Sequence, residues 1–215
     1  MGEYRDAYRT SLTDRDGFWL PAAEAIAWTT PPSRALDPST APLYRWFPDG
    51  VTNGCYNALD RHVDSGRTAL IYDSPVTGSK ATFTYRELRD EVAVFAGALA
   101  GLGVRTGDRV IIYMPMVPRA VVAMLACARL GAIHSVVFGG FAPKELASRI
   151  DDAKPKVVVA ASCGIEPTRV VPYKPIIDEA LTLTQHQPDH VVVTQRPQAT
   201  AEMGPRDVDW DSLVA

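Results

Sequence analysis

The sequence predicts an α/β fold: a layered parallel sheet with crossover helices, preceded by an aromatic and proline-rich helical extension. Three short apolar runs with a β-branched bias, at residues 110–113, 133–138 and 157–161, predict strands that are buried on both faces. The stretches between them have helical spacing, and strands joined by such short helices pair in parallel through crossovers. Ligands of such sheets bind beyond the carboxyl ends of the strands, so a site is expected at that edge.

Residues 1–65 are predicted to form a separate N-terminal extension, and residues 66–215 the α/β domain. Short helices are expected at 3–12 and 14–27, and Thr52 or Asn53 could cap a further helix that ends near Gly66. Such a segment rarely has its own core, so its aromatic side chains are expected to anchor it to a larger body. An aromatic cage for a ligand is the less favoured alternative. The aromatic residues are Tyr4, Tyr8, Phe18, Trp19, Trp28, Tyr44, Trp46 and Phe47.

The α/β domain is expected to begin with strands at 69–72 and near Phe83, joined by a turn at 74–78. Thr84 and Glu87 have the spacing of a capping box and open a helix. That helix ends at Gly101 and Gly103, and this Gly-x-Gly is a poor nucleotide fingerprint because it closes a helix. The buried stripe of the helix is predicted to be Leu88, Val92, Phe95, Ala96 and Leu99.

The next helix ends at Gly131, where a residue tolerant of positive φ is needed. A second crossover helix opens at Ala142 and Pro143, and a third covers 176–184 before a strand at 190–193, which gives a parallel sheet of four strands. Beyond Arg196 the chain is expected to be polar and loose. The stripe of the first crossover helix is predicted to be Val117, Ala120, Val121, Met124, Leu125 and Ala128.

The composition excludes several classes of function. A formal net charge of −3 gives no basic surface for nucleic acid or an anionic membrane. The three cysteines are far apart and form no CxxC pair, which favours a reducing compartment. No signal peptide and no apolar run of about 20 residues is present, so we expect a soluble, cytoplasmic protein.

Standard catalytic motifs are absent from the sequence. There is no G-x-x-x-x-G-K-[ST] phosphate loop, no G-x-S-x-G elbow and no metal-ligand spacing among the histidines. His134 and Cys127 are predicted to be core residues. Cys163, in a loop after a strand, is the cysteine placed for reactivity, although no histidine lies nearby in the sequence to activate it.

Two loops at the carboxyl edge of the sheet are the stronger candidates for a ligand-binding site. They are Phe138-Gly139-Gly140-Phe141, followed by the start of a helix, and the loop at 163–169, which ends in Arg169. Two glycines allow backbone to approach a ligand, the free amides of the helix favour an anion, and Arg169 supplies a cation. The alternative is a Gly-Gly turn beside a surface arginine, and the residues alone do not separate the two.

Several segments together resemble the AMP-forming short-chain acyl-CoA synthetases. They are YRWFPDG (44–50), CYNALDRHV (55–63), ALIYDSPVTG (69–78) and a continuous run from 107 to 175 that contains GIEPTRVV. Within that family the form of the last motif is most similar to the propionate–CoA ligase branch. The resemblance covers essentially the whole chain, with residues 1–65 similar to the N-terminal extension of the family and residues 66–215 to the beginning of its AMP-binding domain.

The resemblance implies an activity for the longer enzymes of the family. Propionate and ATP give an acyl-adenylate and diphosphate with the help of Mg²⁺, and CoA then displaces AMP. It also implies that Phe138, Gly139 and Gly140 contact the CoA nucleotide, together with the segment Glu166-Pro167-Thr168-Arg169. The acetate enzymes have two arginines in this segment. Arg169 matches the second, but Glu166 stands in place of the first, which puts in doubt that two arginines bind the 3′-phosphate of CoA.

The family's phosphate loop and catalytic lysine are not in this sequence, so the resemblance implies that the ATP and Mg²⁺ sites lie outside the chain and that no catalytic residue lies inside it. We expect the chain to stop before the phosphate loop and to be inactive alone, with uncovered apolar surface that favours self-association. The alternatives are an acetyl-CoA synthetase, or a non-catalytic module that binds CoA or a nucleotide or interacts with the complete enzyme.

Overall fold

The computed structural model describes residues 2–140 and 142–215, which divide into two compact units, one up to Asn57 and one from Ala58 to Ala215. The first unit contains α1 (Gly2–Thr13), α2 (Arg15–Ala23), β1 (Leu36–Asp37) and β2 (Arg45–Trp46), and α3 (Gly54–Ala58) lies at its end. Both predicted N-terminal helices are present, although α2 ends at Ala23 and not at residue 27.

Aromatic side chains hold the first unit together. Trp19 packs edge-on against both Phe18 and Trp46, and Phe47 contacts Trp46 and Trp28. The antiparallel pairing of β1 with β2 brings these rings into reach of one another. Five of the eight aromatic residues that the sequence singles out therefore contact each other within this unit, while Tyr4, Tyr8 and Tyr44 are exposed.

The second unit is built on a five-stranded parallel sheet with the order β11-β10-β7-β5-β6. Its strands are β5 (Arg109–Met114), β6 (Ile133–Phe138), β7 (Val157–Ala161), β10 (His190–Thr194) and β11 (Asp207–Asp209). The predicted α/β fold with a parallel sheet is confirmed, but the sheet has a fifth strand. β11 was not predicted, because Asp207-Val208-Asp209 has too little apolar character to indicate a strand.

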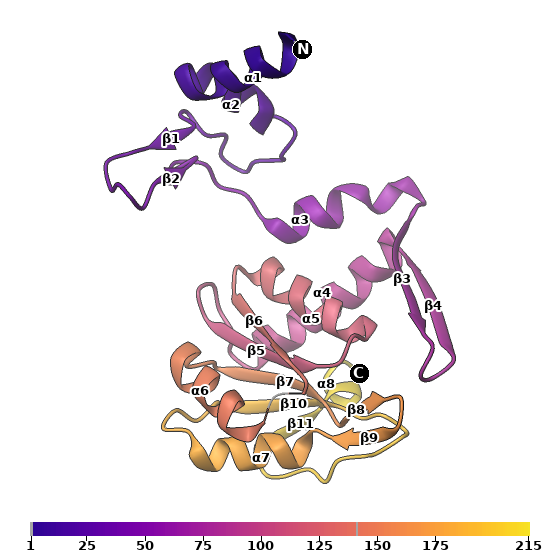
Figure 1. Cartoon of the computed structure of the whole chain (residues 1–215). Coiled ribbons are helices and arrows are strands. Elements are labelled where there is room, and N and C mark those ends of the chain that lie inside the picture. Colours follow the sequence, from indigo (N-terminus) through magenta and orange to yellow (C-terminus); the bar gives the residue numbers. More distant parts are fainter. Residues whose placement is uncertain (1, 141) are drawn as a thin grey trace. The chain divides into compact units, whose positions relative to one another are not determined.

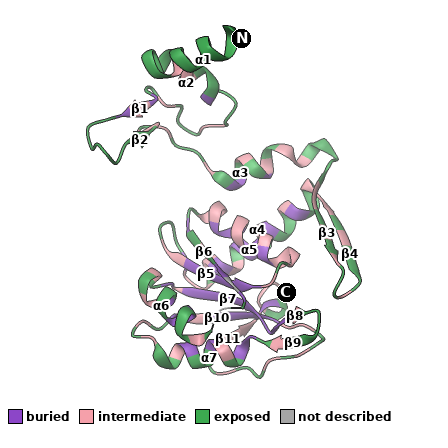
Figure 2. Cartoon of the chain, viewed as in Figure 1, coloured by how far each residue is buried: buried purple, intermediate pink, exposed green. Residues whose placement is uncertain are grey.

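Helices cover both faces of this sheet (Figure 1). α4 (Tyr85–Gly101) and α5 (Pro118–Leu130) lie on one face, and α6 (Pro143–Ala153) and α7 (Lys174–Leu183) on the other. Figure 2 shows the strands as the buried centre of the unit. On the α6–α7 face, alternate strand residues pack with the inner residues of the helices; the cluster includes Ile111, Val158, Val191, Leu146, Ile150 and Ile177.

The start of α4 and its buried face agree with the predictions from the sequence. Thr84 and Glu87 form the predicted capping box, and the buried residues of α4 are the five predicted ones. The 3₁₀ helix η1 (Asp60–Ser65) precedes it and ends at Gly66, and the hairpin β3 (Thr68–Ser74) and β4 (Ser79–Thr84) leads into it. Asn53 accepts a hydrogen bond from the backbone of Tyr56, so the predicted cap is present, but the helix behind it is split into α3 and η1.

The buried face of α5 was predicted incorrectly. Of the expected stripe Ala120 is buried, while the larger side chains Val121, Met124 and Leu125 are half-buried. The inner face consists of small residues, which let the helix approach its neighbours closely. Its buried residues are Ala120, Val122, Ala123, Ala126 and Cys127. The helix ends at Gly131 with φ 69°, as expected.

The sequence predicts that β6 is buried on both faces. This prediction is wrong, because β6 is the edge strand of the described sheet. Ile133 and Val136 are 56% and 53% exposed. His134, predicted to be a core residue, is exposed as well. Burial is a property of the strand's position in the sheet, which its apolar composition does not reveal.

Candidate functional site

The two predicted loops lie at the carboxyl edge of the sheet. Gly139 and Gly140 directly follow β6, and the second segment follows β7 after Ser162. The strand register places Tyr113 of β5 opposite both Val137 of β6 and Ala160 of β7. The ends of these three strands are therefore level, and the segments that leave them start close together. Phe141 lies outside the described residues, and of Phe138 only its place in β6 is described.

The second segment is not a loop but an antiparallel hairpin, formed by β8 (Cys163–Glu166) and β9 (Arg169–Pro172). Pro167 and Thr168 form its turn, and Glu166 is paired with Arg169 across it. The sequence did not reveal the hairpin because its pairing is between two very short strands that flank a turn. The four residues that resemble the CoA-binding stretch of the family are thus held together at the tip of one element.

Tyr173 fills the space between the two segments. A Cβ atom placed on Gly139 would lie 2.3 Å from the Tyr173 hydroxyl oxygen, and one placed on Gly164 would lie 2.2 Å from it. The Tyr113 hydroxyl donates a hydrogen bond of 3.1 Å to the Gly139 carbonyl oxygen, and the rings of the two tyrosines are 5.0 Å apart. The structure therefore brings Gly139 and the base of the hairpin together, through a side chain that the sequence analysis did not single out.

Both phenols are kept neutral by their surroundings. Burial raises the pKa of Tyr113 to about 12, with Tyr173 adding to the shift. Burial also raises the pKa of Tyr173, although the nearby Arg196 opposes the shift. Near neutral pH these side chains serve as a rigid, uncharged support for the Gly139 backbone.

Arg169 is paired with Glu166 at the tip of the hairpin. Its Nε lies 2.7 Å from Glu166 Oε2, and a second hydrogen bond of 3.4 Å joins the same two side chains. This hydrogen bonding lowers the pKa of the Glu166 carboxyl and raises the pKa of the Arg169 guanidinium. Both side chains are exposed, so a phosphate could reach the guanidinium but would compete with the carboxylate for it.

Cys163 and the helix α6 complete this edge. Cys163 is buried in β8, and its carbonyl oxygen accepts a hydrogen bond of 3.0 Å from Arg196. Burial leaves it out of reach of a reactant, so the placement for reactivity predicted from the sequence is wrong. The first turn of α6 has Ala142 as its N-cap residue and no side-chain cap. Pro143 has no N–H and the Glu145 amide donates to the Ala142 carbonyl oxygen, so this turn offers fewer free amides than the sequence predicts.

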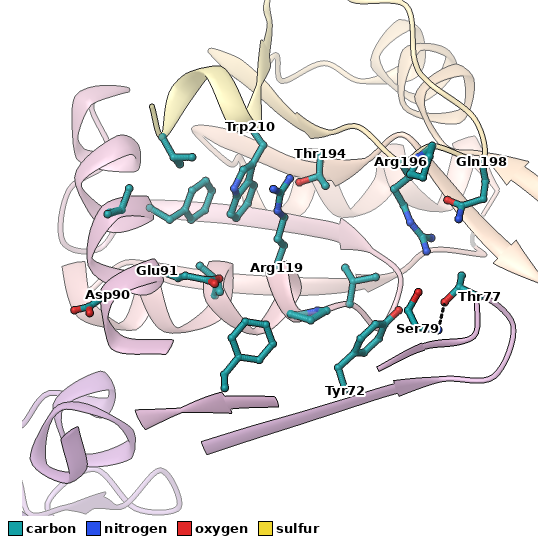
Figure 3. Close-up of a pocket in the computed structure, with 18 residues that line it drawn as sticks. Tyr72, Thr77, Ser79, Asp90, Glu91, Arg119, Thr194, Arg196, Gln198 and Trp210 are labelled. Carbon is teal, nitrogen blue, oxygen red and sulfur yellow. Dashed lines mark hydrogen bonds between the residues drawn. The ribbon is translucent and has the colours of Figure 1, made fainter. Parts of the chain in front are cut away.

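A separate hollow lies between α4, α5 and the hairpin β3–β4 (Figure 3). Its volume is about 690 Å³, and none of the residues singled out at the glycine and hairpin segments lines it. Arg196 connects the two regions, because it lines this hollow and also binds the Cys163 carbonyl. The hollow could not be predicted from the sequence, because its walls come from elements that lie far apart in the chain.

Within residues 2–140 and 142–215, no group of three His, Cys, Asp or Glu side chains is placed to hold a metal ion. In the same part of the chain, no helix has the length and apolar character needed to span a bilayer.

Comparison with known families decides what this architecture is. The model of the family described as AMP-binding enzyme matches residues 59–212, and that described as acetyl-coenzyme A synthetase N-terminus matches residues 4–58. The chain belongs to the AMP-binding enzyme family. The boundary between the two matches falls at the boundary between the two compact units.

Individual relatives are acyl-CoA synthetases. The human mitochondrial acyl-CoA synthetase short-chain family member 3 is 52% identical over 99% of this chain and 32% of its own length. Propionate–CoA ligase of Escherichia coli is 46% identical over 98% of this chain and 34% of its own length. The structure of the acetoacetyl-CoA synthetase from Streptomyces lividans matches all of this chain and 33% of its own with a TM-score of 0.88 and 29% identity.

The resemblance inferred from the sequence and the predicted fold are therefore confirmed, and the family to which the chain belongs is that of the adenylate-forming, short-chain acyl-CoA synthetases. The chain spans about a third of the length of the curated relatives that it matches, in their N-terminal portion.

Proposed function

We propose that the chain forms the N-terminal part of an AMP-forming ligase that converts propionate, ATP and CoA to propionyl-CoA, AMP and diphosphate. The observation that carries the choice of acid is the 46% identity with propionate–CoA ligase over 98% of the chain. The acetoacetyl-CoA synthetase supports the same fold at the lower identity of 29%. ATP and Mg²⁺ would be bound by parts of the longer enzyme, so the 215-residue chain is expected to release no pyrophosphate from ATP and propionate.

The role that we propose for this chain is the binding of CoA at the carboxyl edge of the sheet. The Gly139 and Gly140 backbone, the positive dipole end of α6 and the Arg169 guanidinium suit a phosphate. Tyr173 fixes the Gly139 backbone beside the hairpin that carries Glu166, Pro167, Thr168 and Arg169. CoA contributes a 3′-phosphate that Arg169 could bind, whereas dephospho-CoA does not.

A chimera tests the activity. Residues 1–215 would replace the corresponding third of the E. coli propionate–CoA ligase, and pyrophosphate release would be measured with propionate and with acetate. We expect pyrophosphate release with propionate, which would show that residues 1–215 can form the N-terminal part of such a ligase. A chimera with native-like circular dichroism and no pyrophosphate release would contradict the proposal.

The CoA site is tested in the same chimera by comparing KM for CoA with KM for dephospho-CoA. Arg169→Ala should remove the preference for CoA. Glu166→Gln should strengthen it, because the guanidinium loses its competing carboxylate. Arg86→Ala is the control, since Arg86 forms an exposed ion pair with Asp64 on another part of the surface. Equal KM values for the two thiols before mutation would exclude a role for Arg169 in reading the 3′-phosphate.

We also propose a cytoplasmic location. Its support is that the three cysteines, Cys55, Cys127 and Cys163, are buried and not joined in disulfides among the described residues, which fits a reducing compartment. The mammalian relatives carry the word mitochondrial in their names. Cell fractionation with an antibody against residues 1–57 would separate the two locations.

A further inference from the structure

The hollow between α4, α5 and the hairpin β3–β4 is a groove with apolar walls inside the second unit. Trp210 of α8 (Trp210–Leu213) stacks on Phe95 of α4 with ring centroids 3.6 Å apart. Figure 3 shows side chains from these elements and from the end of β10 converging on one space. Further apolar walls are Phe83, Val94, Val117, Pro118 and Val122. Apolar side chains from several elements that line one hollow make it a candidate place for a partner to bind.

Thr194 supplies a second, independent observation. It is the last residue of β10, lines the groove and is 6% exposed, and its Oγ1 has no hydrogen-bond partner among the described residues. A buried hydroxyl without a partner is unfavourable, so native proteins rarely leave one. The groove therefore offers apolar walls together with one unused hydrogen-bonding position.

Of the charged side chains that line the groove, Glu91 has a pKa raised by burial, which favours its neutral form, and Asp90 pairs with Arg89. Arg119 forms an ion pair with Asp211 and lies over the Trp210 ring. Arg196 donates to the Cys163 carbonyl oxygen. The occupant that fits is therefore mainly apolar, with one group for Thr194, and does not need to carry a charge.

The comparisons indicate what that occupant is. The relatives are about three times as long as the matched region, since the chain covers 32% and 34% of two of them. Val214 itself lines the groove, so polypeptide joined after residue 215 would start at its rim. A segment connected in this way reaches the groove at a high effective concentration.

We propose that this groove seats polypeptide of the longer synthetase: a segment that follows the region equivalent to residues 1–215, lays aliphatic side chains over Phe95 and Trp210, and gives Thr194 Oγ1 a hydrogen-bond partner. The proposal rests on the proposed function, in which the chain is the N-terminal part of a larger enzyme. The proposal also says where this chain would contact the polypeptide that follows it. The contact would lie on the α4–α5 side of the sheet and not at the hairpin that carries Arg169.

The test extends the full chain. The segment that follows the matched third in the E. coli propionate–CoA ligase is joined after Ala215, and a second extension has the same residues in scrambled order. Stability is measured by denaturant unfolding, and protection of β10 by hydrogen exchange. We expect the native-order extension to raise the folding equilibrium constant roughly tenfold or more over the scrambled one, as a ligand bound to the native state does. Equal stability of the two extended chains would overturn the proposal.

Two variants locate the effect. Val94→Trp fills the groove from α4, where Val94 is 51% exposed, and should abolish the gain. Leu183→Trp is the control, because Leu183 is similarly exposed on α7, on the other face of the sheet. A gain that survives Val94→Trp would place the extension elsewhere and reject the groove.

Thr194→Val should change the stability of the unextended and the extended chain in opposite directions, which a general effect on folding would not do. It should leave the unextended chain equally or more stable, because it removes an unpaired hydroxyl, and should destabilise the extended chain, where that hydroxyl is paired. The same direction in both chains would contradict the proposal. The readouts do not depend on activity, so an active chimera together with an unchanged stability would reject the groove and keep the proposed function.

Discussion

At the scale of single residues, the fit of Tyr173 against two glycines explains why the carboxyl edge of the sheet tolerates no side chain there. The hydroxyl oxygen of Tyr173 occupies the place where Cβ atoms of both Gly139 and Gly164 would stand. These glycines make room for a neighbouring side chain of the same chain. A contribution of the Gly139 backbone to CoA binding would depend on Tyr173, which holds it in position.

Gly139→Ala should therefore destabilise the chain by about 1–3 kcal/mol, the range for overpacking a tight site. Gly97→Ala is the control, because Gly97 lies in α4 with nothing within 4 Å of its Cβ position. Alanine favours a helix, so this change should be stabilising by about 0.5–1 kcal/mol. Urea unfolding of both variants gives the two values. In the double variant Gly139→Ala/Tyr173→Leu the costs should be less than additive, and additive costs would show that the two positions do not touch.

The sequence predicted part of this arrangement. It placed Gly139 and Arg169 at the same edge, because parallel strands end together. It missed Tyr173 and Gly164, although a glycine inside an apolar stretch is a known sign of close backbone approach. It also could not reveal that Glu166 neutralises Arg169, since that depends on the hairpin register. The family resemblance identified the segment, and the hairpin explains how its four residues come together.

At the scale of elements, Lys174 shows how the fifth strand is fixed to the sheet. Lys174 opens α7, and its side chain is 7% exposed. Its Nζ lies 2.8 Å from Asp207 of β11 and 2.5 Å from Asp178. Asp207, whose side chain is 2% exposed, also accepts a hydrogen bond of 2.6 Å from the Gly204 amide. This buried ion pair joins β11 to α7 and explains why a polar segment forms a strand.

Lys174→Met should cost about 3–5 kcal/mol of stability, because it leaves the Asp207 carboxylate buried without its cation. Lys80→Met is the matched control. Lys80 forms an ion pair of similar length, 2.7 Å, with Asp73, but both side chains are well exposed. The control should lose no more than about 1 kcal/mol. Guanidinium unfolding measures both, and similar losses in the two variants would show that burial of the pair is not what matters.

The same group makes a prediction about pH. Burial lowers the pKa of Lys174, but its hydrogen bonds to Asp178 and Asp207 outweigh burial, so the pKa is raised above its ordinary value of 10.5. A group whose pKa is raised on folding stabilises the fold fully below its unfolded pKa, and this contribution is lost as the pH rises through the folded pKa. Stability of the parent chain should therefore fall above pH 10.5, and that part of the fall should be absent in Lys174→Met.

Predictions from the sequence were most accurate for individual helices and strands. The predictions that failed at this scale share one cause. The capping box and apolar stripe of α4 are local patterns, and they were predicted correctly. The pairing of β11, the buried face of α5 and the exposure of β6 depend on which element lies alongside. Residue spacing within one element does not contain that information.

At the scale of the whole molecule, the described sheet ends in β6, which pairs with β5 on one side. An edge strand offers free backbone amides and carbonyls, and proteins protect such edges with charged side chains or cover them. β6 has neither device at its exposed apolar positions Ile133 and Val136. Together with the groove, this edge gives the chain two surfaces through which copies can associate.

We therefore expect the 215-residue chain to self-associate as its concentration rises, as the sequence predicts, with β6 as the principal contact. Val136→Lys should reduce the association measured by light scattering, because a lysine on an edge strand opposes strand pairing between copies. Leu183→Lys is the control, since Leu183 is 53% exposed, as is Val136, but lies on helix α7, which offers no strand edge. If the control reduced association as much as Val136→Lys, apolar exposure in general would be responsible. If the parent chain stayed a compact monomer at every concentration, β6 would not behave as an open edge.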